Sequence, residues 1–285
     1  MSQATTRGVL AMFVAVAAFS FMDALLKLFS AHYPPLQVSA IRALASLPFV
    51  VVPLAWSGRL AELKPVRPLP HLLRGLLGVV MLATFVAALR GESMADVYSI
   101  YMAAPLLIVL LAALLLRERV DLGRWLAILV GLAGVIVILR PTGGGLGLAA
   151  GLAAIASALC YALAVIVARA MTRTESSPAM VFSFLLVVAL VCGALAAPGW
   201  VAIQAAHWPW IAAVGVLGTI GQHSITEAFR HAPASTVAPI EYSALLWGMG
   251  IDWVFWATYP SASMLAGAVL VIGAGLYVAW RERPT

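Results

Sequence analysis

Residues 95–138 read ADVYSIYMAAPLLIVLLAALLLRERVDLGRWLAILVGLAGVIVI. Two apolar runs, at about 93–116 and 123–140, flank a short segment that carries most of the charge of this stretch. A helix needs about 20 predominantly apolar residues to cross the hydrocarbon core of a bilayer. The pattern therefore predicts two membrane-spanning helices joined by a charged loop at one membrane surface.

The composition of the whole chain has the same character. Of its 285 residues, 64% are hydrophobic and 10% are charged, and the mean hydropathy is +1.04. Soluble proteins average about 45–50% apolar and about 25% charged residues. This composition excludes a disordered chain, a disulfide-stapled secreted domain and a water-soluble enzyme, and it indicates a polytopic membrane protein.

Ten apolar runs follow one another, with turn residues such as Pro34 and Pro178 between them. Only short loops remain outside the bilayer, so the function must lie within it. We predict an all-α membrane protein with ten transmembrane helices at about 8–30, 35–56, 72–89, 93–116, 123–140, 147–170, 178–198, 208–231, 234–258 and 261–280.

The basic residues indicate how these helices are oriented. With the N-terminus in the cytoplasm, thirteen of the seventeen Lys and Arg residues fall on the cytoplasmic side, and only Arg90 and Arg140 fall on the other. Lys27 and Arg42 fall within spans. Because short cytoplasmic loops of membrane proteins are rich in Lys and Arg, we expect both termini in the cytoplasm. The same rule explains the net charge of +6 without nucleic-acid binding.

The chain contains an internal repeat. Residues 88–106 align without gaps with residues 228–246 at an offset of 140, with identities that include Arg90 and Arg230. A duplicated unit of five helices inserts its second copy in the opposite orientation, which is typical of secondary transporters. We predict two inverted repeats within one membrane domain, at residues 1–142 and 143–285.

The stretch quoted above resembles the signature of EamA-type members of the drug/metabolite transporter superfamily. The shared features are the mid-helix Pro105, the pair Glu118 and Arg119 at the end of that helix, and a glycine-rich helix after it. Arg42 matches an arginine that is usual in the second span. The second half departs from the pattern, because residues 257–260 include no acidic residue.

This resemblance covers nearly the whole chain and implies ten helices in two repeats. Within the superfamily, the sequence looks most like bacterial exporters of aromatic and other neutral amino acids. It therefore also implies a multi-pass protein of a bacterial inner membrane.

Charged residues within spans need an explanation, because a charge at the centre of a bilayer costs about 2.5–3.5 kcal/mol on insertion scales. Asp23 and Lys27 are four residues apart on one helix face, and we expect an ion pair within that helix rather than a gate or a proton site. Arg42 either holds a structural partner or attracts a carboxylate of the substrate. Together with Glu118 and Arg119, these residues are our candidates for gating or structural charges.

Polar residues of the second half are candidates for the substrate site. Glu241 follows Pro239, which frees a backbone carbonyl from its helical hydrogen bond. An acidic residue in a broken helix suits a substrate amine or a proton, but it also suits the cytoplasmic mouth of the protein. Gln222 and His223 lie on the eighth span, and we predict no metal site because no third ligand has suitable spacing.

Aromatic residues are candidates for the apolar part of that site. Tyr98, Tyr101 and Pro105 share one helix face, which suits a cavity lined by rings, although tyrosine is also common at membrane interfaces. We predict a substrate site that consists of Phe19, Tyr98, Tyr101, Met102, Tyr161, Gln222, His223, Glu241, Ser243 and Trp247.

The sequence thus predicts a secondary transporter that exports small neutral metabolites by alternating access, with amino acids, aromatic ones included, as the leading substrates. Two alternatives stay open: a multidrug or nucleotide-precursor exporter of the same fold, and a membrane channel. Nucleotide-binding and hydrolase motifs are absent, so we expect neither an enzyme nor a cofactor. The expected partners are a small-molecule substrate and the lipid bilayer; protons are a candidate coupling ion, and a monomer suffices.

Overall fold

The apolar runs form helices because backbone N–H and C=O groups within a bilayer must bond to one another. The computed structural model describes residues 3–90, 92–115, 122–139, 147–171, 174–231 and 238–281. Its α-helices are α1 (Gln3–Ser30), α2 (Pro35–Trp56), α3 (Pro68–Leu89), α4 (Met94–Tyr101), α5 (Ala104–Leu115), α6 (Leu122–Leu139), α7 (Leu148–Met171), α8 (Ser177–Ala196), α9 (Trp208–His231), α11 (Ser243–Trp256) and α12 (Ala262–Arg281). Short 3₁₀ segments are η1 (Leu60–Leu63), η2 (Ala197–Gly199), η3 (Ala205–His207) and η4 (Ala238–Tyr242).

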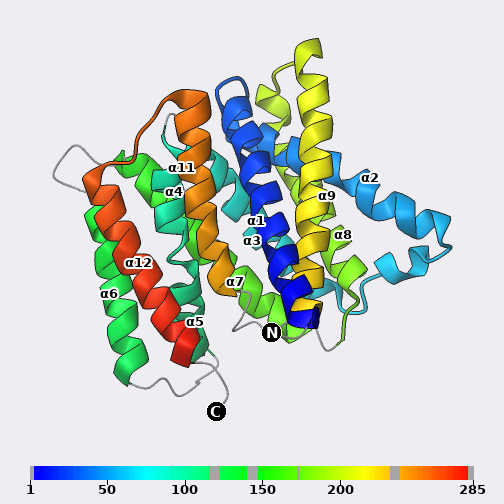
Figure 1. Ribbon diagram of the computed structural model, residues 1–285. Coiled ribbons are helices and arrows are strands. Elements are labelled where there is room, and N and C mark those ends of the chain that lie inside the picture. The colour runs from blue at the N-terminus through cyan, green and yellow to red at the C-terminus, as the bar shows by residue number, and fades with distance from the viewer. Residues whose placement is uncertain are drawn as a thin grey trace.

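The helices lie side by side in one bundle, as Figure 1 shows. The start of α1 and the end of α12 lie at the same end of this bundle, which we call the terminal end; the opposite one is the distal end. α6 and α12 pack together at one edge, away from α2 at the other edge.

Within the described ranges, five segments are long and apolar enough to cross a membrane: Thr6–Ser30, Pro35–Trp56, Pro68–Leu89, Leu148–Ala168 and Ser177–Gly199. Shorter apolar stretches are Met94–Ile108, Trp125–Ile138 and Ala262–Tyr277. The prediction of an all-helical, multi-pass membrane protein is therefore confirmed. The number of ten spans and the cytoplasmic position of the termini stay predictions.

Two of the predicted helices are interrupted. The predicted helix 93–116 is divided into α4 and α5 by a turn at Met102 and Ala103. Pro105 has no N–H to donate to the Tyr101 carbonyl, so the regular hydrogen bonds of the helix cannot continue through this point. The second interruption lies 140 residues later, where η4 ends at Tyr242 and α11 begins.

The most extensive helix pairs each combine one helix from before residue 142 with one from after it. α1 packs on α9, α3 on α7, α2 on α8, α4 on α11 and α6 on α12. The main packing contacts therefore join helices from the two sides of residue 142.

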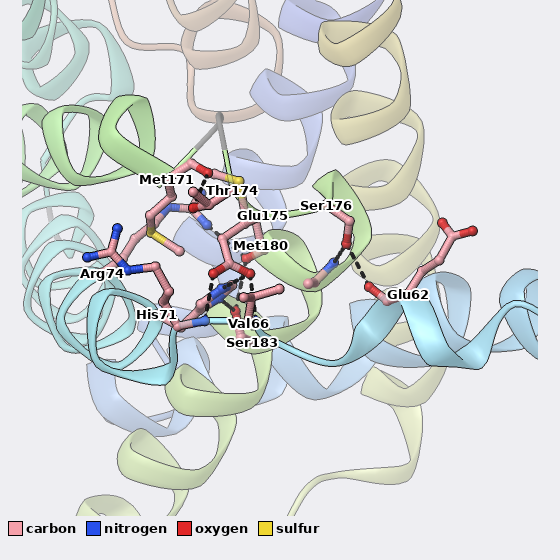
Figure 2. A network of polar contacts seen from close by, with 12 residues as sticks. Glu62, Val66, His71, Arg74, Met171, Thr174, Glu175, Ser176, Met180 and Ser183 are labelled. Carbon is pink, nitrogen blue, oxygen red and sulfur yellow. Dashed lines mark hydrogen bonds and ion pairs between the residues drawn. The ribbon is translucent and has the colours of Figure 1, made fainter.

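A polar network joins the α2–α3 loop to the α7–α8 loop at the terminal end (Figure 2). The Glu175 carboxylate accepts hydrogen bonds from the backbone N–H groups of Val66 at 2.9 Å and Arg67 at 2.7 Å. It also lies 3.0 Å from Nε2 of the buried His71, whose Nδ1 contacts the Ser183 hydroxyl. The network fixes the loop of one half of the chain to a loop of the other.

The distal end has an equivalent connection between the α1–α2 turn and the α8–α9 loop. The Gln37 side chain donates to the Val201 carbonyl at 2.6 Å and accepts from the Val201 N–H at 2.9 Å. The Tyr33 hydroxyl accepts from the Gln204 N–H at 3.1 Å and lies 2.7 Å from Nδ1 of His207. Both ends of the bundle are thus held by polar contacts between segments far apart in the sequence.

Acid should weaken the network at the terminal end. Removal from water raises the pKa of the Glu175 carboxyl, but the N–H donors of Val66 and Arg67 and the His71 ring outweigh this effect, so its pKa lies below the ordinary value. A carboxyl with a lowered folded-state pKa stabilises the fold at neutral pH. That contribution is lost as the pH falls through its unfolded-state value of about 4.3 and then through the lower folded-state value.

We expect Glu175→Gln to lower the melting temperature of the detergent-purified protein at pH 7, because a charged acceptor of two backbone donors is lost. The difference from the unsubstituted protein should shrink as the pH falls below about 4. Glu62→Gln is the control, because the Glu62 side chain is 35% exposed and pairs with the exposed Arg59. A Glu175→Gln difference that stays constant with pH would contradict this assignment.

Candidate functional site

A cavity of about 620 Å³ lies between the helices, with walls formed mainly by α1, α2, α3, α4, α7, α8, α9 and η4. The structure brings together there, among the residues selected from the sequence, Phe19, Asp23, Arg42, Tyr98, Tyr101, Met102, Tyr161, Gln222, His223 and Glu241. They come from both predicted repeats, so the cavity depends on how the two halves pack against each other.

The two interrupted helices contribute residues at their breaks. Tyr101 and Met102 come from the end of α4, and Glu241 comes from η4. Tyr101 and Glu241 occupy corresponding positions at the offset of 140. Irregular backbone at membrane depth is tolerated where it is buried in protein or lines a cavity, and broken helices at corresponding places mark the substrate site in many transporters.

One wall of the cavity is aromatic. The Tyr101 ring centroid lies 5.4 Å from that of Tyr161 and 5.5 Å from that of Phe85. Phe85 also stacks on Tyr98 with 6.3 Å between centroids. These separations suit favourable aromatic contacts. Phe85 was not selected from the sequence, because a phenylalanine in an apolar helix gives no sign of which face it occupies.

The cavity contains charges of both signs. The Asp23 carboxylate accepts a 2.9 Å hydrogen bond from the Tyr98 hydroxyl and lies within electrostatic range of Arg42. Glu241 lies within electrostatic range of Tyr161. None of the ion pairs among the described residues includes Arg42 or Glu241. The cavity therefore offers a guanidinium and a carboxylate that form no ion pair with one another or with another described residue.

Arg74 is a further cavity residue. It lies in the second turn of α3, where Nη1 donates to the Met180 carbonyl at 2.8 Å. Its guanidinium carbon lies 5.0 Å from the centre of the Phe184 ring. An arginine near the start of a span looks like a loop charge in the sequence, so nothing there indicated this position.

A buried ion pair lies toward the distal end of the bundle, beyond the lining of the cavity. Nζ of Lys27 in α1 donates to Oδ1 of Asp252 in α11 at 2.7 Å, and the two side chains are 9% and 2% exposed. Oδ2 of Asp252 accepts from the N–H of Ala95, in the first turn of α4, at 2.9 Å. Nζ of Lys27 also lies 4.2 Å from the ring centroid of Trp256. Three helices therefore meet at this pair.

The predicted ion pair between Asp23 and Lys27 is wrong, because each residue binds a partner on another helix. Pairs four residues apart on a helix contribute only about 0.2–0.5 kcal/mol. Asp252 gives Lys27 a buried partner and also accepts from the N-terminus of α4, where the helix dipole favours a carboxylate. The sequence did not indicate Asp252, because its contacts lie 157 and 225 residues away along the chain.

The cavity opens toward the terminal end. Its lining extends to Leu54 near the end of α2 and to Ser177 at the start of α8, which both lie at that end. Gln222 and His223 in the lining are exposed. The Lys27–Asp252 pair lies on the distal side of this lining and is not part of it.

Some selected residues lie elsewhere. Ser243 and Trp247 do not line the cavity: Ser243 is the first residue of α11, and the Trp247 ring packs 5.8 Å from the Phe21 ring. Trp247 also contacts a buried cluster on α1, so it serves helix packing there. Glu118 and Arg119 lie outside the described residues.

The chain was compared with known proteins. The model of the EamA-like transporter family matches residues 6–140 and, separately, residues 148–280. A pseudopaline exporter of Pseudomonas aeruginosa is 28% identical over 266 residues, which are 93% of each chain. A riboflavin transporter of Rhizobium johnstonii is 29% identical over 78% of this chain and 74% of its own.

Two further likenesses agree with these matches. An S-adenosylmethionine uptake transporter of Rickettsia prowazekii is 27% identical over 83% of this chain and 79% of its own. A crystal structure with 22% sequence identity superposes with a TM-score of 0.66 over 98% of this chain and 99% of that one, which shows a shared fold.

The resemblance seen in the sequence is thereby confirmed. The family model covers both halves of the chain, and the similar proteins are named as transporters rather than enzymes. This multi-pass membrane protein belongs to the EamA-like transporter family.

Proposed function

We propose that the protein exports small neutral metabolites, above all amino acids with aromatic ones included, by alternating access at the central cavity. The observation that carries this proposal is that Arg42 and Glu241 line the same cavity as the aromatic rings of Tyr101 and Tyr161, and that neither belongs to an ion pair of the described residues. An amino acid presents a carboxylate, an ammonium group and a side chain. The first two suit Arg42 and Glu241, and the third suits the rings.

A carrier suits this cavity better than a channel. The cavity reaches the terminal end, while the buried pair of Lys27 and Asp252 blocks the distal end. Alternating access requires such a one-sided cavity, whereas an open channel requires a continuous path. We propose that the site opens to each side in turn and that a single copy of the chain suffices.

The orientation follows from the charge pattern. The start of α1 and the end of α12 lie at the terminal end of the bundle, which agrees with an even number of spans, and an excess of basic residues supports a cytoplasmic position for that end. The described state then faces the cytoplasm. The two separate ranges matched by the family model, and the pairing of helices across residue 142, support a duplicated and inverted five-helix unit. The bacterial relatives support an inner-membrane location.

The relatives support a small organic substrate but differ in direction. Their names include a pseudopaline exporter, a riboflavin transporter and an S-adenosylmethionine uptake transporter. We propose export, on the resemblance to amino-acid exporters stated above.

A transport assay tests the substrate class. In proteoliposomes, entry of labelled phenylalanine should be faster when the vesicles contain unlabelled phenylalanine, tryptophan or threonine than when they are empty, because exchange avoids the return of an empty carrier. A pH gradient across the membrane should change the rate if protons are the coupling ion. If folded protein moves none of these amino acids under any loading, the amino-acid proposal is wrong, and a drug or nucleotide-precursor exporter becomes the leading candidate.

Substitutions in the cavity test the site. We expect Arg42→Gln and Glu241→Gln each to reduce phenylalanine exchange about tenfold or more, since a hydrogen bond to a charged group contributes about 1.5–3 kcal/mol. Arg59→Gln is the matched control, because Arg59 is exposed, lies in the α2–α3 loop and pairs with Glu62. Thermal unfolding of each variant establishes that it is folded. Normal exchange by both cavity variants would overturn the assignment.

A further inference from the structure

Asp23 and Lys27 lie one turn apart on the same face of α1, but in this state each binds a residue of a different helix. Lys27 binds Asp252 in α11, and Asp23 binds Tyr98 in α4. The first contact belongs to the seal at the distal end, and Asp23 and Tyr98 line the cavity directly beneath it. One turn of α1 therefore connects the seal to the substrate site.

Opening the distal end must separate Lys27 from Asp252. α1, α4 and α11 meet at this pair, so no path can form there while the pair is intact. A buried ammonium group left without its partner would be strongly destabilising. Lys27 therefore needs a second carboxylate in the open state.

Asp23 is the carboxylate that stays with Lys27 when α1 moves away from α4 and α11. It lies four residues before Lys27 on the same helix, and an acidic residue at that position on the N-terminal side of a lysine is the favourable order for pairing. Asp96 also lies within electrostatic range of Lys27. Asp96, however, belongs to α4 and bonds with Ser93 at its N-terminus, so it departs with α4.

Arg42 connects this exchange to the substrate. It faces Asp23 from α2, and its positive charge stabilises the Asp23 carboxylate in its present position. If an anionic group of the substrate occupies Arg42, that attraction is reduced and Asp23 becomes available to Lys27. This step rests on the proposed function, because it requires Arg42 to bind the substrate.

We propose that Lys27 exchanges Asp252 for Asp23 when the distal end opens, and that a substrate carboxylate on Arg42 promotes this exchange. The distal seal is thus stable while the cavity is empty and weakens when the cavity is filled. Asp23 acts as a positioning residue: it controls the gate through Lys27 and need not touch the substrate.

A cysteine reporter in the seal tests the proposal. Ala24 is 7% exposed and belongs to the buried cluster that contains Ala95 and Tyr98, so Ala24→Cys changes little volume. The two native cysteines are first replaced, Cys160→Ser and Cys192→Ala. The exposed Thr258, replaced by Cys in a separate variant, identifies the distal side of the membrane. Labelling by a membrane-impermeant maleimide from that side is then timed with and without phenylalanine.

The expected results separate Asp23 from Asp96. Asp252→Asn should accelerate labelling of the reporter about tenfold without phenylalanine. Lys27 then loses its charged partner in α11 and pairs with Asp23, which favours the open distal end. Asp23→Asn keeps an acceptor for the Tyr98 hydroxyl but cannot balance the charge of Lys27, so labelling should fall about tenfold and lose its response to phenylalanine. Asp96→Asn is the matched control and should behave like the parent protein.

Two outcomes would overturn the exchange. The first is that labelling of the Asp23→Asn variant still responds to phenylalanine as in the parent protein. The second is that Asp96→Asn slows labelling and abolishes its response to phenylalanine, as expected for Asp23→Asn. These two variants keep the structurally observed Lys27–Asp252 pair, so the test stands even if Asp252→Asn fails to fold. If the basal rates change as expected but phenylalanine has no effect on the parent, the exchange is supported and the amino-acid proposal is overturned.

Discussion

The buried ion pair between Lys27 and Asp252 is the contact on which the distal end of the bundle depends. An ammonium and a carboxylate that are almost fully enclosed must stay together, because separating them leaves two unpaired charges in a medium of low dielectric constant. Asp252 also bonds to the first turn of α4, so three helices are held at one point. On the other side of this contact, the lining of the cavity extends to Leu54 and Ser177 at the terminal end.

The cavity itself depends on the two broken helices. A bundle of continuous apolar helices would fill its centre with aliphatic side chains and would have no place for a charged solute. Pro105 interrupts the helix that contains Tyr101, and Pro239 lies in the 3₁₀ segment that carries Glu241. Each break brings a polar residue to the wall of the cavity. Proline destabilises regular helices, and at these two positions the resulting break places a polar side chain at the cavity.

The pairing of helices limits how such a protein can move. Each of the main helix pairs joins a helix from before residue 142 to one from after it, and polar networks hold loops of the two halves together at both ends. The two halves of the sequence therefore do not move as independent blocks. Movement must separate groups that contain helices from both halves, and α1, with Asp23 and Lys27, lies where such a separation opens the distal end.

The sequence by itself determined the membrane class, the positions of most helices and much of the site. Hydrophobic runs indicate helices, because backbone groups in lipid must form hydrogen bonds with one another. Prolines and charges within those runs indicate departures from a regular apolar helix. Tyr101, Arg42 and Glu241 were selected from such departures. Only the tertiary structure decided the partners. Lys27 binds Asp252 rather than the nearby Asp23, Arg74 enters the cavity, and Trp247 packs away from it. The partner of a side chain, and whether that side chain points into the cavity, depend on contacts between helices that are far apart in the chain. A local sequence pattern carries no information about which neighbour a helix will pack against or from which side.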